Sequence, residues 1–289
     1  MNYKKMAAAV ALGSLTLLGA SALSSAQAAN VGGLRFNANY TGTGEADIKG
    51  SNESLQTNTF TFDASYAFAT FIYSHTEYDF SGYDDPFDSL DKVAIDLHHN
   101  GYISSNLAYG VGLTLGALYE EDFDIGDSYN VSPRAVLGWT FKNGMTAFLG
   151  AFANLNGADN VYLPIVGLKL GDESDHGWMG SIAYPATMVQ YRFNDWLAVG
   201  ANFMTVRDTY HLDDDWDRKG DWADGYLREE SYGAGLSATL SPMKMFKVTA
   251  GVFSYFDREF KVYNSSGDEI DSFETDNTWG GYLRAGFSF

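Results

Sequence analysis

The chain has 289 residues, with 37 acidic and 18 basic side chains, and its formal net charge is −19. Nucleic-acid-binding proteins carry a basic surface, and a chain as acidic as this one does not have it, so the composition excludes that class. The absence of cysteine excludes disulfides, thiolate chemistry and a lipid-modified cysteine. Aromatic residues make up 16% of the chain beside 31 glycines and only 5 prolines, a balance that is unusual for a soluble enzyme.

The first 28 residues have the features of a secretory signal peptide. Lys4 and Lys5 supply its basic start, residues 6–18 its apolar run, and residues 26–28 a small-x-small cleavage site. The apolar run is too short and wrongly flanked for a membrane-spanning helix, although a retained helical anchor is the alternative. We therefore expect a signal peptide over 1–28 and a single exported domain over 29–289.

After the signal, apolar and polar side chains alternate in short segments, as in strands with two different faces. The clearest segment is Asn106–Tyr119, whose 14 residues exceed the ~5–6 of a typical globular strand and suit a tilted membrane strand. The same alternation occurs in further segments along the chain, at residues 34–40, 56–66, 70–80, 92–98, 129–141, 146–155, 197–205, 231–240, 246–259 and 279–289.

The alternation weakens between residues 156 and 191. Two apolar stretches there each contain a proline, Pro164 and Pro185, which cannot donate a hydrogen bond to a neighbouring strand. These stretches are therefore expected to form short strands, bulges or edges. If Gly157–Pro185 is a strand-like segment plus a loop and adds no hairpin to the barrel, the sequence predicts about 12 strands. If this region forms a hairpin of its own, it predicts 14.

No window of 18 apolar residues follows the signal, so the sequence predicts no membrane helix. A protein can then span a membrane only as a closed barrel, because lipid cannot satisfy free backbone groups. Short connections such as 142–145 are interleaved with long acidic ones such as 208–230, like the periplasmic turns and extracellular loops of membrane barrels. The sequence thus predicts an all-β fold, a transmembrane antiparallel up-and-down β-barrel.

The last eleven residues, Trp279–Phe289, alternate and end the chain on an aromatic side chain. They resemble the closing strand of Gram-negative outer-membrane β-barrel proteins, and with the export signal and the alternation the resemblance covers residues 30–289. The chain is similar to poorly characterised porin-like families. The resemblance implies location in the cell outer membrane, contact with outer-membrane lipids and lipopolysaccharide, and insertion by the assembly machinery, with Phe287 and Phe289 as the assembly signal. It does not identify a solute or an oligomeric state.

The face opposite the apolar one would line the lumen, and it carries small and charged residues. Arg35 and Asp63 are expected to lie level across the first hairpin, with Arg284 joining them where the last strand meets the first. The belt is either a selectivity ring or a salt-bridge network that plugs a narrow barrel. The predicted lumen charge belt consists of Arg35, Asp63, Lys92, Asp96, Arg134, Lys247 and Arg284.

These features favour a passive channel or transporter for small solutes, with a structural or surface-binding barrel with a plugged lumen as the alternative. A third interpretation, an outer-membrane lipid-modifying hydrolase, requires a His–Ser or His–carboxylate pair at the outer leaflet. The one dense candidate, His98-His99-Asn100 with Ser104 and Ser105 beyond it, lies at the predicted periplasmic end. We therefore predict that the protein is not an enzyme and uses no cofactor.

Acidic clusters occur in three predicted extracellular loops, within residues 84–91, 120–127 and 213–224. Because Ca²⁺ and Mg²⁺ take several carboxylate oxygens, such ions could bridge these loops to lipopolysaccharide phosphates. None of the clusters matches the calcium-binding loop, since the glycine that should follow Asp217 comes at 220, two places late. Solvated loops that repel other anions are the alternative.

Overall fold

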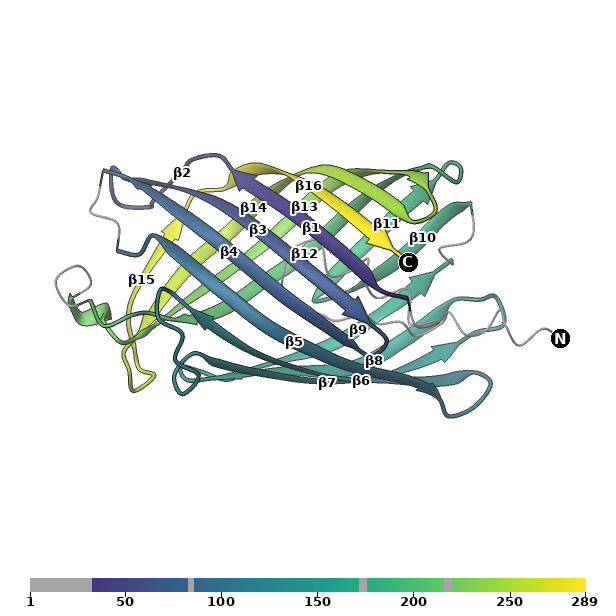
Figure 1. The fold of residues 1–289 in the computed structure, drawn as a ribbon, viewed down its shortest axis with the longest axis horizontal. Helices are drawn as coiled ribbons and strands as arrows, with labels where there is room; N and C mark the ends of the chain where they lie inside the picture. Colours follow the sequence, from purple (N-terminus) through teal and green to yellow (C-terminus); the bar gives the residue numbers. More distant parts are fainter. Residues whose placement is uncertain (1–32, 83–85, 172–175, 216–219) are drawn as a thin grey trace.

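The computed structural model describes residues 33–82, 86–171, 176–215 and 220–289, and the expected signal peptide lies outside this part. Fourteen antiparallel strands form a closed barrel, in which β16 pairs with both β14 and β1 (Figure 1). The barrel strands are β1 (Arg35–Thr43), β3 (Ser54–Tyr66), β4 (Ala69–Ser81), β5 (Ser89–Tyr102), β6 (Leu107–Tyr119), β7 (Tyr129–Thr140), β8 (Thr146–Asn156), β9 (Val161–Leu170), β10 (Gly177–Tyr184), β11 (Ala186–Arg192), β12 (Leu197–His211), β13 (Tyr226–Met243), β14 (Phe246–Tyr263) and β16 (Thr278–Ser288).

Three smaller elements lie in the connections at one end of the barrel. They are β2 (Ala46–Asp47), the 3₁₀ turn η2 (Gly220–Trp222) and β15 (Glu269–Thr275), which pairs with β14. The C-terminus and the start of β1 lie at the opposite end, together with short turns such as residues 67–68 (Figure 1). Short turns mark the periplasmic side of membrane barrels, so β2, β15 and η2 lie on the extracellular side.

The count of 12 strands was wrong and the alternative of 14 is correct. Residues 157–185, counted as one excursion, contain β9 and β10, and β11 follows directly. Pro185 occupies the tight turn between β10 and β11, where no backbone donor is needed. Pro164 lies within β9 opposite Ala151 of β8. The hairpin strands are short, with 8 and 7 residues, which is why the alternation in this region was hard to detect.

Two predicted loops are shorter than expected. Residues 208–230 were expected to form one loop, but β12 continues to His211 and β13 begins at Tyr226. Likewise, β14 continues to Tyr263, and much of the predicted loop after residue 260 is strand. The reason is that these strand ends bury apolar side chains inside the barrel, so the backbone stays in the sheet.

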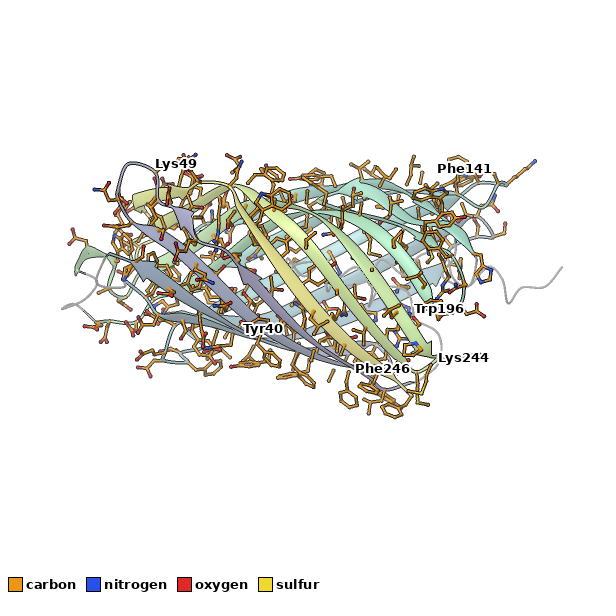
Figure 2. The ribbon with its side chains drawn as sticks, turned by 90° about the horizontal axis from the view of Figure 1, so that it is seen from above. Tyr40, Lys49, Phe141, Trp196, Lys244 and Phe246 are labelled. Atoms are coloured by element: carbon orange, nitrogen blue, oxygen red, sulfur yellow. The ribbon has the colours of Figure 1, made fainter. Side chains whose placement is uncertain are left out.

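The expected inside and outside faces are confirmed by the structure. Apolar side chains on the outer face are exposed around the barrel, including Phe60, Ile95, Val111, Leu137, Leu149, Val166, Ile182, Leu236, Val252 and Leu283. Figure 2 shows side chains around the barrel, with Lys49 at one end and Phe141, Trp196, Lys244 and Phe246 at the other. So much contiguous apolar surface is not stable in water and requires lipid. None of the described residues belongs to a helix that is long and apolar enough to span a membrane.

Candidate functional site: the lumen of the barrel

The most strongly bound pair in the lumen joins Asp96 of β5 to Arg134 of β7. Arg134 donates from Nη1 to Asp96 Oδ1 at 2.7 Å and from Nη2 to Oδ2 at 2.9 Å, while Thr114 donates to the same carboxylate at 2.7 Å. The guanidinium must cross β6 to reach β5, and it does so over Gly112, where a Cβ would overlap it. A bidentate pair of this kind is both strong and geometrically specific.

A second ion pair crosses the lumen nearer the extracellular end. Lys92 of β5 donates to Asp208 of β12 at 2.9 Å, and both side chains are buried. Buried charges need partners of this kind, because an unpaired charge is costly away from water. The pair therefore ties two walls that are not neighbours in the sheet.

A third crossing contact is centred on Glu229 of β13. Its carboxylate accepts from the Tyr78 hydroxyl of β4 at 3.0 Å and from Arg258 Nε of β14 at 2.8 Å. The Arg258 guanidinium also lies over the ring of Phe260, 4.8 Å from its centroid. This contact again links opposite walls at the extracellular end.

The rest of the predicted belt does not form one ring. Asp63 lies opposite Asn37 rather than Arg35, and Asn37 donates to it at 2.6 Å. Arg284 Nη2 is 3.9 Å from Asp63 Oδ2, a longer contact than the other lumen pairs. Arg35 lies two residues closer to the periplasm, opposite Ser65 and Ser288. The expectation that Arg35 and Asp63 are level is therefore wrong, because the register is offset by two residues.

Lys247 also lies apart from the other charges. It is exposed, pairs with Gly286 of β16 and stands near the start of β14, at the periplasmic mouth. The charged residues are thus spread from the periplasmic mouth to the extracellular end, in separate pairs.

The extracellular end of the lumen is filled by buried apolar side chains, which we call the apolar cluster. They come from strands on opposite walls and from the loops above them. Its members are Ile48, Leu55, Tyr78, Phe80, Phe87, Leu90, Leu118, Tyr210, Leu212, Leu227, Phe260 and Val262, with Trp222 and Phe273 packed against them. The cluster obstructs direct passage from the lumen to the extracellular side.

The barrel is also pinched at this end. His211 of β12 pairs in parallel with Tyr119 of β6, a strand on the opposite side of the barrel. The backbone N–H of Glu120 donates to the His211 carbonyl at 3.1 Å, and Glu120 Oε2 accepts from the Asp213 N–H at 3.1 Å. The extracellular end of β12 is therefore bent across the lumen and held against β6.

A small cavity of about 20 Å³ lies in the lumen, which is room for about one water molecule. Asn130 donates to Asn154 at 2.7 Å along its wall, and Ser132 donates to Asn130 at 2.9 Å. Leu118 belongs both to this wall and to the apolar cluster, so the two are in contact. The lining residues are Lys92, Ala94, Thr114, Gly116, Leu118, Asn130, Ser132, Phe152, Asn154 and Asp208.

Exposure of the lumen side chains differs between the two ends. Towards the periplasm, lumen-facing residues such as Asn37, Gly200, Ser237 and Thr249 are partly exposed although they point into the barrel. In the apolar cluster, Leu118 is 1% exposed and Phe260 0%. These side chains in the periplasmic half of the lumen are thus more accessible to solvent than those of the apolar cluster.

The histidine candidates for catalysis have structural contacts. His98 Nδ1 is 3.4 Å from Asp96 Oδ2, a carboxylate that Arg134 already binds. Ser104 accepts from the Leu107 N–H at 3.2 Å within its turn, and Ser105 donates to Asn106 at 3.0 Å. These contacts do not test the prediction about enzymatic activity.

The acidic loops are only partly described, since residues 83–85 and 216–219 lie outside the described part. Within that part, no three His, Cys, Asp or Glu side chains converge as a metal site would require. The described acidic side chains include Asp91, 3.0 Å from His75, and Asp224, 3.3 Å from His211. Lys49 donates to Glu274 at 2.6 Å, and this hydrogen bond raises the pKa of the lysine. The cation bridge stays a prediction.

Sequence reasoning missed Asp208, Glu229 and Arg258, as well as the apolar cluster. Asp208 and Glu229 lie within residues 208–230, which the sequence predicts to be a long acidic loop. The alternation of side chains beyond Thr205 could have revealed Asp208, because Val206, Asp208, Tyr210 and Leu212 share the inner face of β12. Glu229 lies opposite Asp208 on β13. Arg258 was hidden by the irregular register between β13 and β14 near Glu230.

Closure of the sheet, the apolar exterior and the polar lumen define a transmembrane β-barrel of the kind found in Gram-negative outer membranes. No family model matches the chain, and no curated protein matches it. Among solved structures, it is similar to the COG4313 outer membrane channel from Pseudomonas putida F1, at 12% identity and a TM-score of 0.46, over 90% of this chain and 96% of that one.

Two further similar structures are also barrels. The KdgM porin in complex with disordered oligogalacturonate shares 8% identity at a TM-score of 0.37, over 88% of this chain and 99% of that one. The Ralstonia pickettii toluene transporter TbuX shares 10% identity at a TM-score of 0.35, over 90% of both chains. Likeness at these levels is limited to the fold and identifies no solute.

Proposed function

We propose that the protein is a passive outer-membrane channel or transporter for small solutes. The observation that carries the proposal is the solvent-accessible space in the periplasmic half of the lumen, where Asn37, Gly200, Ser237 and Thr249 are partly exposed inside a closed wall. Small and polar inward side chains leave room for a solute and supply hydrogen bonds to it. A barrel that served only as a membrane anchor would have no need of this space.

The apolar cluster favours the second candidate, a structural or surface-binding barrel with a plugged lumen. The two functions differ in flux, so planar-bilayer recording of the purified protein separates them. We expect small, infrequent openings, because the cluster has to move before ions pass. Complete silence over a wide voltage range, including in variants with a weakened cluster, would favour the plugged barrel.

Location in the outer membrane is tested by fractionation. We expect the mature protein to sediment with outer membranes and to migrate faster on gels when unheated than when boiled, because a closed barrel keeps its hydrogen bonds in detergent. Recovery as a soluble periplasmic protein would contradict the proposal at its first step.

Insertion by the assembly machinery is tested at the C-terminus. Phe289 is 71% exposed at the closing seam, where its N–H donates to the Leu34 carbonyl at 2.9 Å and its ring lies edge-on to Phe36, with centroids 6.5 Å apart. Deleting Phe289 is expected to lower the amount of folded barrel while secretion across the inner membrane continues. Deleting one residue from the exposed turn at Lys244 serves as a control for chain shortening. Normal assembly without Phe289 would mean that the terminal aromatic is not a signal.

A further inference from the structure

The barrel wall is interrupted between β9 and β12. The β10–β11 hairpin fills the space between these strands only in the periplasmic half: β10 pairs with β9 from Val166 to Leu170, and β11 pairs with β12 from Ala198 to Met204. Beyond the hairpin, residues 161–165 of β9 pair only with β8, and residues 205–210 of β12 pair only with β13. The edges of β9 and β12 therefore face each other here without backbone hydrogen bonds between them.

This interruption has a defined border on each side. At its periplasmic side, the Thr205 N–H donates to the Pro185 carbonyl at 3.2 Å, which fixes the hairpin tip against β12. At its extracellular side, the loop at residues 157–160 reaches β13, where Arg228 donates to the Asp159 carboxylate at 3.0 Å and to its carbonyl at 2.6 Å. The bend of β12 towards β6 draws one edge inward, away from β9.

The lumen wall along β9, one edge of the interruption, is apolar. Phe148, Phe152, Leu163, Ile165 and Ala183 pack together on the inner face of β8, β9 and β10. The walls formed by β3, β4 and β5 instead carry buried polar residues, among them Thr61, Asp63, Ser74 and Asp96. The interruption therefore borders an apolar wall along β9, whereas its other edge, β12, carries Asp208, which accepts from Lys92.

The outer surface beside the interruption carries aromatic side chains and one ion pair, in which Arg207 of β12 donates to Glu230 of β13 at 2.6 Å. Tyr162 of β9 is 70% exposed. Phe203 of β12 stacks on Tyr232 of β13, with ring centroids 6.0 Å apart. Aromatic rings of this kind mark the level of the lipid headgroups on membrane barrels. The interruption therefore begins where the hydrocarbon of the outer leaflet meets its headgroups.

We propose that the interruption between β9 and β12 is a lateral opening, through which a small apolar solute passes between the lumen and the outer leaflet. An apolar solute gains about 25 cal/mol for each Å² that it keeps out of water, so a route along an apolar wall into lipid is favoured over one through water. The cavity between Phe152 and Asp208 lies on the lumen side of this route. The proposal rests on the channel function and adds the solute class and the route.

The test uses the absence of native cysteine. Val206 lies on the inner face of β12 within the interruption, and Thr59 lies on the inner face of β3 with a paired strand on each side; both are partly exposed. Val206→Cys and Thr59→Cys are each reconstituted in liposomes and treated with pyrene maleimide dissolved in the lipid. We expect Val206→Cys to react severalfold faster. In a second arm, Asp159→Ala in the Val206→Cys background should speed the reaction further by releasing the loop at 157–160.

Equal reaction at the two positions would overturn the lateral opening, and so would reaction of Val206→Cys with a charged maleimide in water alone. If Val206→Cys does not give the fast-migrating unheated form, Leu163→Cys replaces it, because Leu163 is partly exposed on the inner face of β9 and pairs only with Phe152 of β8. Bilayer recording is done in parallel on the unaltered protein. If solute flux is observed but the cysteines at 206 and 59 are labelled equally, the lateral opening is refuted and the channel function stands. If the cysteine at 206 is labelled selectively but no solute flux occurs, the channel function is refuted and the opening stands.

Discussion

Replacing Asp96 with alanine is expected to destabilise the barrel by about 3–5 kcal/mol, because removing one member of a buried ion pair leaves the other charge uncompensated. The Asp96 side chain is fully buried and that of Arg134 is 4% exposed, so water cannot replace the lost partner. The free energy of unfolding in liposomes, measured by urea titration and followed by tryptophan fluorescence, gives the effect.

The double variant distinguishes pairing from simple loss of packing. Arg134→Met removes the charge but keeps much of the side-chain volume, so Asp96→Ala with Arg134→Met should regain part of the loss. Glu274→Ala is the matched control, since its pair with Lys49 is about half exposed and exposed ion pairs contribute little to stability. Strictly additive effects, or a cost for Asp96→Ala as small as the control's, would contradict the pairing.

Alternation predicted the barrel because lipid and lumen impose different chemistry on the two faces of each strand. In β6, this requirement holds along the whole strand, so Leu107–Tyr119 was found almost to the residue. In β10 and β11, the strands are short and join through Pro185 without a loop, so neither length nor loop composition marked two strands. The closed barrel was therefore predictable from sequence, and its exact strand number was not.

The charged lumen residues show a similar division. Lys92 and Arg134 could be assigned to the inner face, because inner and outer positions follow from period two. Their partners depend on register and on strand bending, which alternation does not encode. Asp208 meets Lys92 only because β12 bends to pair with β6 at His211, and an acidic segment before a loop gives no sign of that contact.

Replacing Phe87 with alanine is expected to produce the largest change in flux. Phe87 lies in the loop between β4 and β5 and is 0% exposed. Its ring packs edge-on against Tyr78 and Phe80, with centroids 5.0 and 5.2 Å away. Truncating a buried phenylalanine costs about 3–5 kcal/mol. Since Phe87 anchors the described part of this loop in the apolar cluster, its loss should destabilise the closed position of the loop more than the barrel wall.

Planar-bilayer recording of Phe87→Ala should therefore show more frequent and larger openings than the unaltered protein, while the unheated form still migrates as a folded barrel. Phe123→Ala is the matched control: Phe123 lies in the next extracellular loop, is 56% exposed and contacts Tyr119 at 5.4 Å. It removes the same ring without touching the apolar cluster, so its recordings should equal those of the parent. Conductance that is unchanged by Phe87→Ala would mean that the cluster is not the element that closes the lumen. In that case the pinch between β6 and β12, with the Lys92–Asp208 pair beneath it, would have to hold the lumen shut by itself.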